Sequence, residues 1–157
     1  MSTSSLPVRH DVSLRALNTF GIEASAHAYL PVEGIEQLRT LRQDAGLMAL
    51  PRLVLGGGSN LLLTQDFSGL VLHMQNRGID IAGEDDNFIY VRAAAGENWH
   101  AFVQWTLQQD LGGLENLSLI PGSVGAAPIQ NIGAYCIEIK DRFHSLQAFD
   151  LISGELL

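Results

Sequence analysis

The stretch Leu53-Val-Leu-Gly-Gly-Gly-Ser-Asn60 decides how the first half of the chain folds. Residues 51–55 predict a short buried strand, which leads directly into three glycines. Because glycine adopts positive φ without strain, successive N–H groups can converge on one anion, and Ser59 and Asn60 add side-chain donors. No Walker lysine follows, and Leu61 stands where a G-x-G-x-x-G pattern needs glycine. These residues alone leave two alternatives open, a phosphate-binding turn and an ordinary tight surface turn.

The residues around this stretch predict an α/β order. A strand at residues 26–31 precedes an amphipathic helix over residues 31–45, which suggests parallel strands joined by a crossover helix. A second amphipathic helix is expected over residues 99–108, with Asn98 as its N-cap and His100 on its polar face. Further strands are expected at residues 69–74, 78–81, 88–94 and 146–151.

A second unusual stretch is Ile120-Pro-Gly-Ser-Val-Gly-Ala-Ala-Pro-Ile-Gln-Asn-Ile-Gly-Ala-Tyr135. Its glycines and alanines keep the surface thin, so a planar ring could lie against the backbone. Gln130 and Asn131 could hydrogen-bond the edge of such a ring, and Tyr135 could contact it. The alternative is a buried loop whose small residues pack against a strand, and this stretch alone slightly favours that alternative. Two stretches poor in side chains nevertheless favour one ligand that spans both.

Composition narrows the classes of function. The 157 residues carry 9 Lys and Arg against 17 Asp and Glu, a net charge of -8 without a basic patch, so we expect no nucleic-acid partner. No apolar run approaches the ~20 residues of a membrane helix and no signal peptide is visible, so we expect a cytoplasmic protein without a membrane partner. The single cysteine excludes an intramolecular disulfide, and the histidines lack metal-ligand spacing, so no metal is expected. Cys136 is expected to be a buried structural thiol.

Five motifs in order along the chain resemble the UDP-N-acetylenolpyruvoylglucosamine reductase family, also called UDP-N-acetylmuramate dehydrogenases. They are Asn18-Thr-Phe-Gly-Ile22, Leu55-Gly-Gly-Gly-Ser-Asn60, Ala95-Gly-Glu-Asn-Trp-His100, Gly113-Leu-Glu-Asn-Leu117 and the stretch from Ile120 to Tyr135. The resemblance runs from about Leu17 to the end. It implies the vanillyl-alcohol-oxidase/PCMH-type FAD-binding fold of the α/β (α+β) class, with two subdomains of which the second is cut short.

The expected domains follow from this resemblance. Residues 1–16 would form a flexible N-terminus, residues 17–72 a first FAD-binding subdomain and residues 73–157 an incomplete second one. The chain ends shortly after a turn at Ser153-Gly154, so we expect a truncated polypeptide. Its partner would be the missing C-terminal part of the same enzyme, including the substrate-binding domain.

The resemblance also implies the cofactor site. Residues 55–60 would hold the pyrophosphate of FAD, and residues 120–135 would run along the flavin. The expected FAD contacts are Leu55, Gly56, Gly57, Gly58, Ser59, Asn60, Ile120, Pro121, Gly122, Ser123, Gly125, Ala126, Ile129, Gln130, Asn131, Gly133, Ala134 and Tyr135. Cys136 stands where the family usually has glycine, and a positive φ there would strain the backbone by about 1–3 kcal/mol.

The implied activity is the NADPH-linked reduction of a sugar nucleotide, UDP-N-acetylglucosamine enolpyruvate, to UDP-N-acetylmuramate. It would serve bacterial peptidoglycan synthesis and hence cell-wall biogenesis, cell shape and cell division. No catalytic residue is assigned, because the Tyr-Arg-x-Ser segment, the Gly-Ser-Phe-Phe segment and the late glutamate of the family do not occur here. We therefore expect an FAD-binding fragment that is inactive alone. The alternatives are a non-catalytic remnant or flavin-binding module that needs another chain, and another oxidase of this flavin fold.

Overall fold

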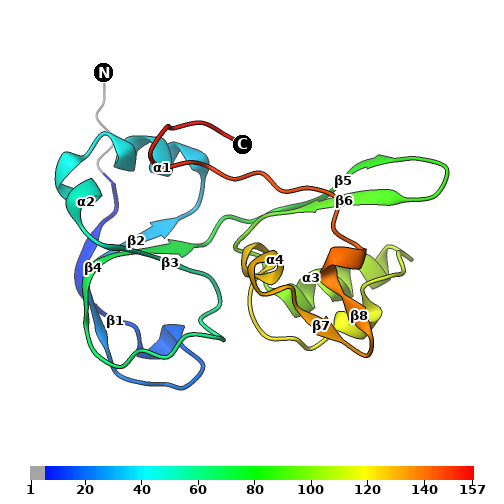
Figure 1. Ribbon diagram of the computed structural model, residues 1–157, viewed down its shortest axis with the longest axis horizontal. Coiled ribbons are helices and arrows are strands. Elements are labelled where there is room, and N and C mark those ends of the chain that lie inside the picture. The colour runs from blue at the N-terminus through cyan, green and yellow to red at the C-terminus, as the bar shows by residue number, and fades with distance from the viewer. Residues whose placement is uncertain (1–5) are drawn as a thin grey trace. The chain divides into compact units, whose positions relative to one another are not determined.

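The computed structural model describes residues 6–157, which form two compact units (Figure 1). Unit 1 comprises the chain up to Gln75 together with Leu146–Leu157, and unit 2 comprises Asn76–Ser145. The boundary thus follows Gln75 rather than residue 72, and the end of the chain belongs to unit 1 rather than to the second subdomain. Residues 1–5 of the expected flexible N-terminus lie outside the described residues.

Unit 1 is built on a four-stranded sheet in the order β1-β2-β4-β3. The strands are β1 (Arg9–Ser13), β2 (Ser25–Val32), β3 (Arg52–Leu55) and β4 (Phe67–Met74). β2, β4 and β3 run parallel, and β1 pairs antiparallel with β2. The expected parallel strands are confirmed, but β4 lies between the two strands that the crossover joins. Residues 9–13, expected to be flexible, instead form the edge strand β1.

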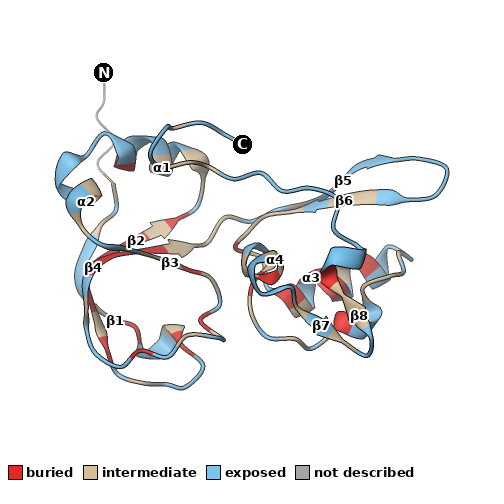
Figure 2. Ribbon diagram, viewed as in Figure 1, coloured by how far each residue is buried: buried red, intermediate tan, exposed pale blue. Residues whose placement is uncertain are grey.

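Two helices, α1 (Ile35–Arg42) and α2 (Ala45–Ala49), form the crossover. The sequence predicted one helix, but the chain begins a second helix after Asp44, whose carboxylate accepts a hydrogen bond from Leu47 N–H at 3.0 Å. Leu41 of α1 is buried in one core cluster with residues of β2 and β4. Figure 2 colours the buried residues of the chain red. The other buried residues of this core are Ala28, Leu30, Val32, Leu70 and Leu72.

The end of the chain forms a short hairpin on unit 1. Ala148 and Leu157 exchange two backbone hydrogen bonds, at 2.8 and 3.0 Å. Leu151 packs against the core beneath α1, and the Arg42 guanidinium donates a hydrogen bond to Ile152 O at 3.2 Å. These contacts, made after the chain has passed through unit 2, explain why residues 146–157 belong to unit 1.

Unit 2 combines a two-stranded ribbon with short helices. The ribbon consists of β5 (Ile79–Glu84) and β6 (Ile89–Ala93), which pair antiparallel. The remaining elements are α3 (Trp99–Gln108), η2 (Glu115–Leu117), η3 (Val124–Ala126), α4 (Ala127–Gln130), β7 (Gly133–Ala134), β8 (Ile137–Glu138) and η4 (Ile139–Asp141). Their buried core consists of Trp99, Phe102, Val103, Leu117, Ala127 and Ile139.

The helix α3 begins as the sequence predicts. The Asn98 side chain accepts a hydrogen bond from Ala101 N–H at 2.9 Å, which is the expected N-cap. Trp99 is buried at the first helical residue and anchors the helix in the core of unit 2. Among residues 6–157, no helix is both long enough and apolar enough to cross a membrane.

Candidate functional site

The glycine turn (residues 56–60) leaves the sheet of unit 1 at the carboxyl end of β3. Parallel sheets bind ligands at this end of their strands. Gly58 is buried at φ 63°, and a Cβ there would lie 1.9 Å from Leu17 O, so only glycine fits. Thr19 N–H donates to Gly58 O at 3.2 Å, whereas Gly57 and Asn60 are exposed. The turn is therefore held in place at Gly58 and exposed to solvent at Gly57 and Asn60.

A buried asparagine holds the loop beneath the glycine turn. Asn18 donates from Nδ2 to Leu14 O and Ile22 O, both at 2.9 Å, and its Oδ1 accepts from Ile22 N–H at 3.0 Å. Asn18 is 6% exposed, so these bonds are shielded from water. The motif that begins at Asn18 was part of the resemblance but was given no role. In the structure, this motif supports Gly58 through the adjoining residues Leu17 and Thr19.

Two further polar side chains of unit 1 lie near the same edge of the sheet and were missed from sequence. His73 of β4 is the register partner of Leu55, which immediately precedes the glycine turn. Its Nδ1 lies 2.6 Å from the Tyr29 hydroxyl of β2. Burial raises the pKa of Tyr29, although Arg9, 4.7 Å above the ring, opposes this shift. Single Tyr and His residues within apolar strands give no sequence signal for such a pair.

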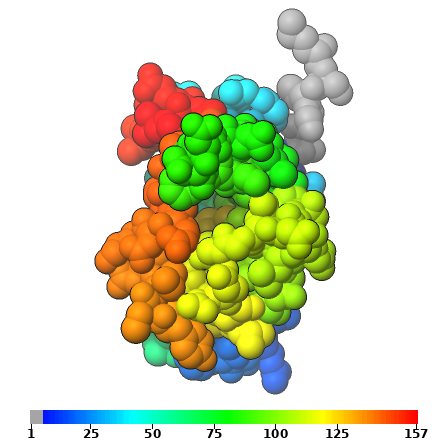
Figure 3. Space-filling view, turned by 90° about the vertical axis from the view of Figure 1, so that its right-hand side faces the viewer, coloured from blue at the N-terminus to red at the C-terminus, as the bar shows by residue number. Residues whose placement is uncertain are grey.

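The small-residue segment (residues 120–135) lies on the surface of unit 2, where yellow and orange residues adjoin in Figure 3. Ile129 and Tyr135 are 85% and 83% exposed, and Leu119 immediately before the segment is 77% exposed. These three large apolar side chains are therefore accessible to solvent. A Cβ on Gly125 would approach the Cβ of Ala95 to 2.6 Å, so this glycine serves internal packing.

A shallow hollow, too narrow to hold a water molecule, lies within unit 2. It is lined by Trp99, Pro121, Gly122, Ser123, Ala126, Ala127, Gln130 and Ile132. Ser123 is 6% exposed, and its Oγ has no hydrogen-bond partner. A buried hydroxyl without a partner is unfavourable, and Ser123 carries such a hydroxyl.

The Asn131 side chain is engaged within unit 2. Its Nδ2 donates to Glu138 Oε2 at 3.0 Å, and its Oδ1 accepts from Lys140 N–H at 3.4 Å. The ion pair with Lys140, followed by the Asn131 bond, lowers the pKa of Glu138. Asn131 adopts a left-handed conformation at φ 44°, where it ends α4. The amide thus joins the end of α4 to β8.

Tyr135 and Cys136 form the two-residue turn between β7 and β8. Both have positive φ, 50° and 63°, as in the type I′ turns that suit tight hairpins. The prediction of a buried Cys136 is wrong, since the residue is exposed. The sequence rule failed because burial of a cysteine is a tendency of its apolar side chain, whereas the turn places these two residues at the tip of a hairpin.

A holding segment (residues 95–100) fixes the start of the small-residue segment. Gly125 N–H donates to Ala95 O and Val124 N–H to Glu97 O, both at 2.9 Å, and Trp99 N–H donates to Gly122 O at 3.0 Å. The bridge between Asn98 and Ser123 belongs to the same pairing. Two of the motifs that carry the resemblance, residues 95–100 and residues 120–135, are therefore joined by backbone hydrogen bonds.

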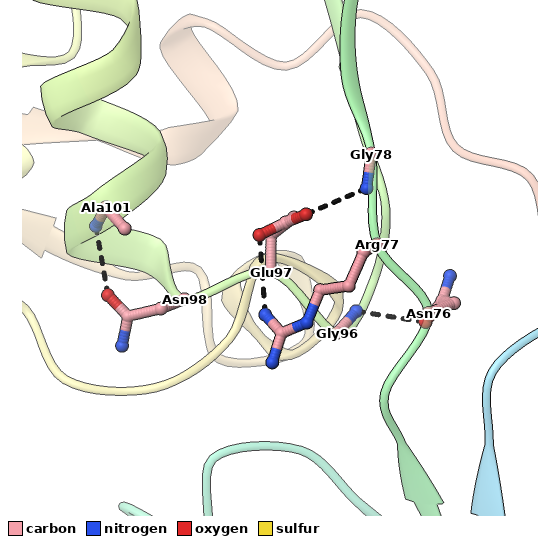
Figure 4. A network of polar contacts seen from close by, with 7 residues as sticks. All are labelled: Asn76, Arg77, Gly78, Gly96, Glu97, Asn98 and Ala101. Atoms are coloured by element: carbon pink, nitrogen blue, oxygen red, sulfur yellow. Dashed lines mark hydrogen bonds and ion pairs between the residues drawn. The ribbon is translucent and has the colours of Figure 1, made fainter.

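The holding segment is in turn hydrogen-bonded to residues 76–78, which immediately precede β5 (Figure 4). The Glu97 carboxylate accepts from Gly78 N–H at 2.8 Å and pairs with Arg77 at 3.3 Å. Asn76 Oδ1 accepts from Gly96 N–H at 3.0 Å. Glu97 thus has a structural role within unit 2, in keeping with the absence of any catalytic assignment from sequence.

Comparison with known families gives a match between residues 26–157 and the model of the FAD binding domain. This match covers most of the chain. The chain belongs to the FAD binding domain family. The predicted fold agrees with this membership, because the matched range covers all of unit 2 and most of the mixed α/β unit 1.

Two relatives of this FAD binding domain protein carry the same name. The chain is 54% identical over 98% of its length to a UDP-N-acetylenolpyruvoylglucosamine reductase of Burkholderia mallei, and 55% identical over 94% to one of Pseudomonas putida. It spans 44% of the length of each relative. The crystal structure of the Thermus caldophilus UDP-N-acetylenolpyruvylglucosamine reductase matches 87% of the chain and 47% of that structure, with 27% identity and a TM-score of 0.66. The predicted resemblance and the predicted fold are both confirmed.

Proposed function

We propose that this chain is the FAD-binding part of a UDP-N-acetylenolpyruvoylglucosamine reductase. The observation that carries the proposal is the identity of 54% over 98% of the chain to a relative of that name. The whole enzyme would reduce UDP-N-acetylglucosamine enolpyruvate with NADPH in the cytoplasm, as a step of peptidoglycan synthesis. The sugar nucleotide would bind with the help of residues beyond those that match here, since the chain spans 44% of the relative.

The residues of both stretches suit FAD. The glycine turn offers backbone N–H groups and the side chains of Ser59 and Asn60 to a pyrophosphate, so it needs no lysine. In unit 2, the partnerless hydroxyl of Ser123 and the exposed apolar side chains of Ile129 and Tyr135 suit a ligand that is both aromatic and polar. These observations support the expected contacts of the glycine turn and of Ser123, Ile129 and Tyr135. The Asn131 amide and Gly125 are instead engaged within unit 2.

When bound, FAD would supply hydride transfer, and the chain would supply its position and surroundings. Gly58, fixed by Leu17 and Thr19, would set the path of the backbone around the pyrophosphate. The holding segment would fix the backbone of Gly122 and Val124 beside the flavin. Both supports are made by residues of this chain alone, and such preorganisation would reduce the entropy lost on binding.

A fluorescence titration of the 157-residue chain with FAD tests the proposal. We expect saturable binding that Ser123→Ala weakens about five- to tenfold, because the ligand loses one buried hydrogen bond. The unliganded variant should be no less stable than the original chain, since the substitution removes a buried hydroxyl without a partner. Ser145→Ala changes an exposed serine of the same unit and should alter neither quantity. No saturable FAD binding by the unaltered chain would contradict the proposal.

A further inference from the structure

His100 of α3 accepts hydrogen bonds from the turn that precedes the small-residue segment. Its Nδ1 lies 3.2 Å from Leu119 N and 3.1 Å from Ser118 Oγ. A backbone N–H can only donate, so Nδ1 is the acceptor in the hydrogen bond from Leu119 and carries no proton in it. The sequence placed His100 on the polar face of the helix with no role, but the structure engages it with a defined partner.

The partner of His100 has an unfavourable backbone conformation. Leu119 lies at φ 65° and its side chain is 77% exposed, so the strain is not offset by burial of that side chain. On one side of Leu119, the Trp99 indole donates to Leu117 O at 2.8 Å. On the other side, Trp99 N–H donates to Gly122 O at 3.0 Å. Trp99 therefore holds both flanks of the turn, and His100 holds the strained residue between them.

We propose that His100 is a positioning residue for FAD. Its Nδ1 fixes Leu119 in the left-handed conformation, and this conformation directs the backbone of Ile120, Pro121 and Gly122 to the surface where the flavin lies. The part that concerns FAD rests on the proposed function. The part that concerns Leu119 rests only on the contacts within unit 2 and is measurable without a ligand.

The pair His100→Asn and His100→Gln separates this role from simple helix stability. The Asn Oδ1 stands two bonds from Cβ, as Nδ1 does, and can accept from Leu119 N–H, whereas the Gln acceptor stands one bond further out. His144→Gln is the matched control. This exposed imidazole lies against the Tyr90 ring, with 4.6 Å between ring centroids, and makes no contact with Leu119 in the described bonds.

Amide hydrogen exchange and FAD titration of the 157-residue variants give the readouts. We expect His100→Gln to accelerate exchange of the Leu119 amide about fivefold and to weaken FAD binding by a similar factor, because one hydrogen bond is lost. His100→Asn should restore both within twofold, and His144→Gln should change neither. A long-range proton–nitrogen correlation spectrum of the unaltered chain should show Nδ1 unprotonated.

Three results would overturn the proposal. They are a proton on Nδ1 of the unaltered chain, equal Leu119 exchange in His100→Gln and the unaltered chain, and equal loss of FAD binding in His100→Asn and His100→Gln. If the unaltered chain bound no FAD, the proposed function would fail, while the exchange rates would still decide whether His100 fixes Leu119.

Discussion

The strained turn at Tyr135 and Cys136 gives a prediction for a single residue. Cys136 has φ 63° at the second position of a type I′ turn, where glycine is favoured because a Cβ is disfavoured at positive φ. We expect Cys136→Gly to raise the free energy of unfolding by about 1 kcal/mol, measured by urea denaturation. Cys136→Ala removes the thiol but keeps the Cβ, so it should leave stability unchanged. Equal stabilisation by both variants would attribute the effect to the thiol rather than to the backbone.

Asn18 gives a prediction of the opposite sign, because removing its side-chain amide should greatly lower the free energy of unfolding. The residue is buried and its side chain makes three hydrogen bonds with Leu14 and Ile22. We expect Asn18→Ala to lower the free energy of unfolding by about 2–3 kcal/mol, because buried backbone groups lose their partners. Thermal unfolding followed by circular dichroism measures this loss. The exposed Asn87→Ala should stay within about 0.5 kcal/mol of the original chain; a similar loss in both variants would refute the special role of Asn18.

Sequence patterns predicted the buried elements and the ribbon of β5 and β6, but they missed the exposed edge strand β1. β2, β4 and α3 have buried apolar residues at regular spacing, and each was expected close to its observed bounds. β1 reads Arg-His-Asp-Val-Ser and is mostly exposed, so it carries no hydrophobic pattern; its pairing with β2 alone makes it a strand. The break before α2 depends on one capping contact of Asp44, which a periodicity of apolar residues does not reveal.

The sequence predicted which backbone segments form the candidate site. It did not predict the contacts that hold these segments in place. Runs of glycine and alanine identify surfaces where a ligand can approach, whatever lies beneath them. The partners that fix them, Leu17 under Gly58 and His100 beside Leu119, are distant in sequence and belong to no local pattern. For the same reason, the sequence could not decide that Gly125 packs against Ala95.

The tip of the β5–β6 ribbon provides a test of pH dependence at the scale of an element. Asp85 accepts hydrogen bonds from Tyr90 Oη at 2.6 Å and from the N–H groups of Asn87 and Phe88, both at 2.8 Å. The Tyr90 bond is the largest cause that lowers the pKa of Asp85, followed by the two backbone bonds. A carboxylate with a lowered pKa contributes stability above its ordinary pKa, and this contribution is lost as pH falls through the lowered value.

We therefore expect the ribbon tip to remain ordered at neutral pH and to loosen only in acid below the ordinary range of aspartate. Carboxyl carbon chemical shifts of Asp85 should give a titration midpoint below that of an ordinary aspartate. The same bond raises the pKa of Tyr90, and Asp85→Asn should remove this shift. An ordinary Asp85 midpoint, or a Tyr90 pKa unchanged by Asp85→Asn, would show that the bond does not persist in solution.

At the scale of the whole molecule, unit 2 interrupts unit 1 in sequence. The chain leaves unit 1 at Gln75 and returns at Leu146, and the returning hairpin is held by Leu151 and by the Arg42 bond to Ile152. A sequence pattern locates the hairpin but does not show which core it packs against. The expected division into consecutive subdomains therefore placed the hairpin in the second subdomain. Each of the two predicted ligand-binding stretches lies in a different unit, the glycine turn in unit 1 and the small-residue segment in unit 2.

The last prediction concerns turnover by the 157-residue chain. Reduction of an enol ether requires groups that stabilise the developing negative charge and supply a proton at the reacting atoms. The resemblance places these groups in a Tyr-Arg-x-Ser segment, a Gly-Ser-Phe-Phe segment and a late glutamate, and the 157 residues contain neither of the two segments. We therefore expect the chain, mixed with FAD, NADPH and UDP-N-acetylglucosamine enolpyruvate, to oxidise NADPH at least about 100-fold more slowly than a complete relative, since one lost stabilising group alone has about this effect.

The Pseudomonas putida relative, of which the chain matches 44%, is the matched control in the same absorbance assay. A chain that binds FAD but shows no oxidation dependent on the sugar nucleotide would agree with a role in holding the cofactor. Sustained NADPH oxidation that requires the sugar nucleotide would contradict it. In that case, charge stabilisation and proton donation would have to come from groups within the 157 residues, and the polar side chains around the small-residue segment, Ser118 and Ser123 among them, would be the first to replace.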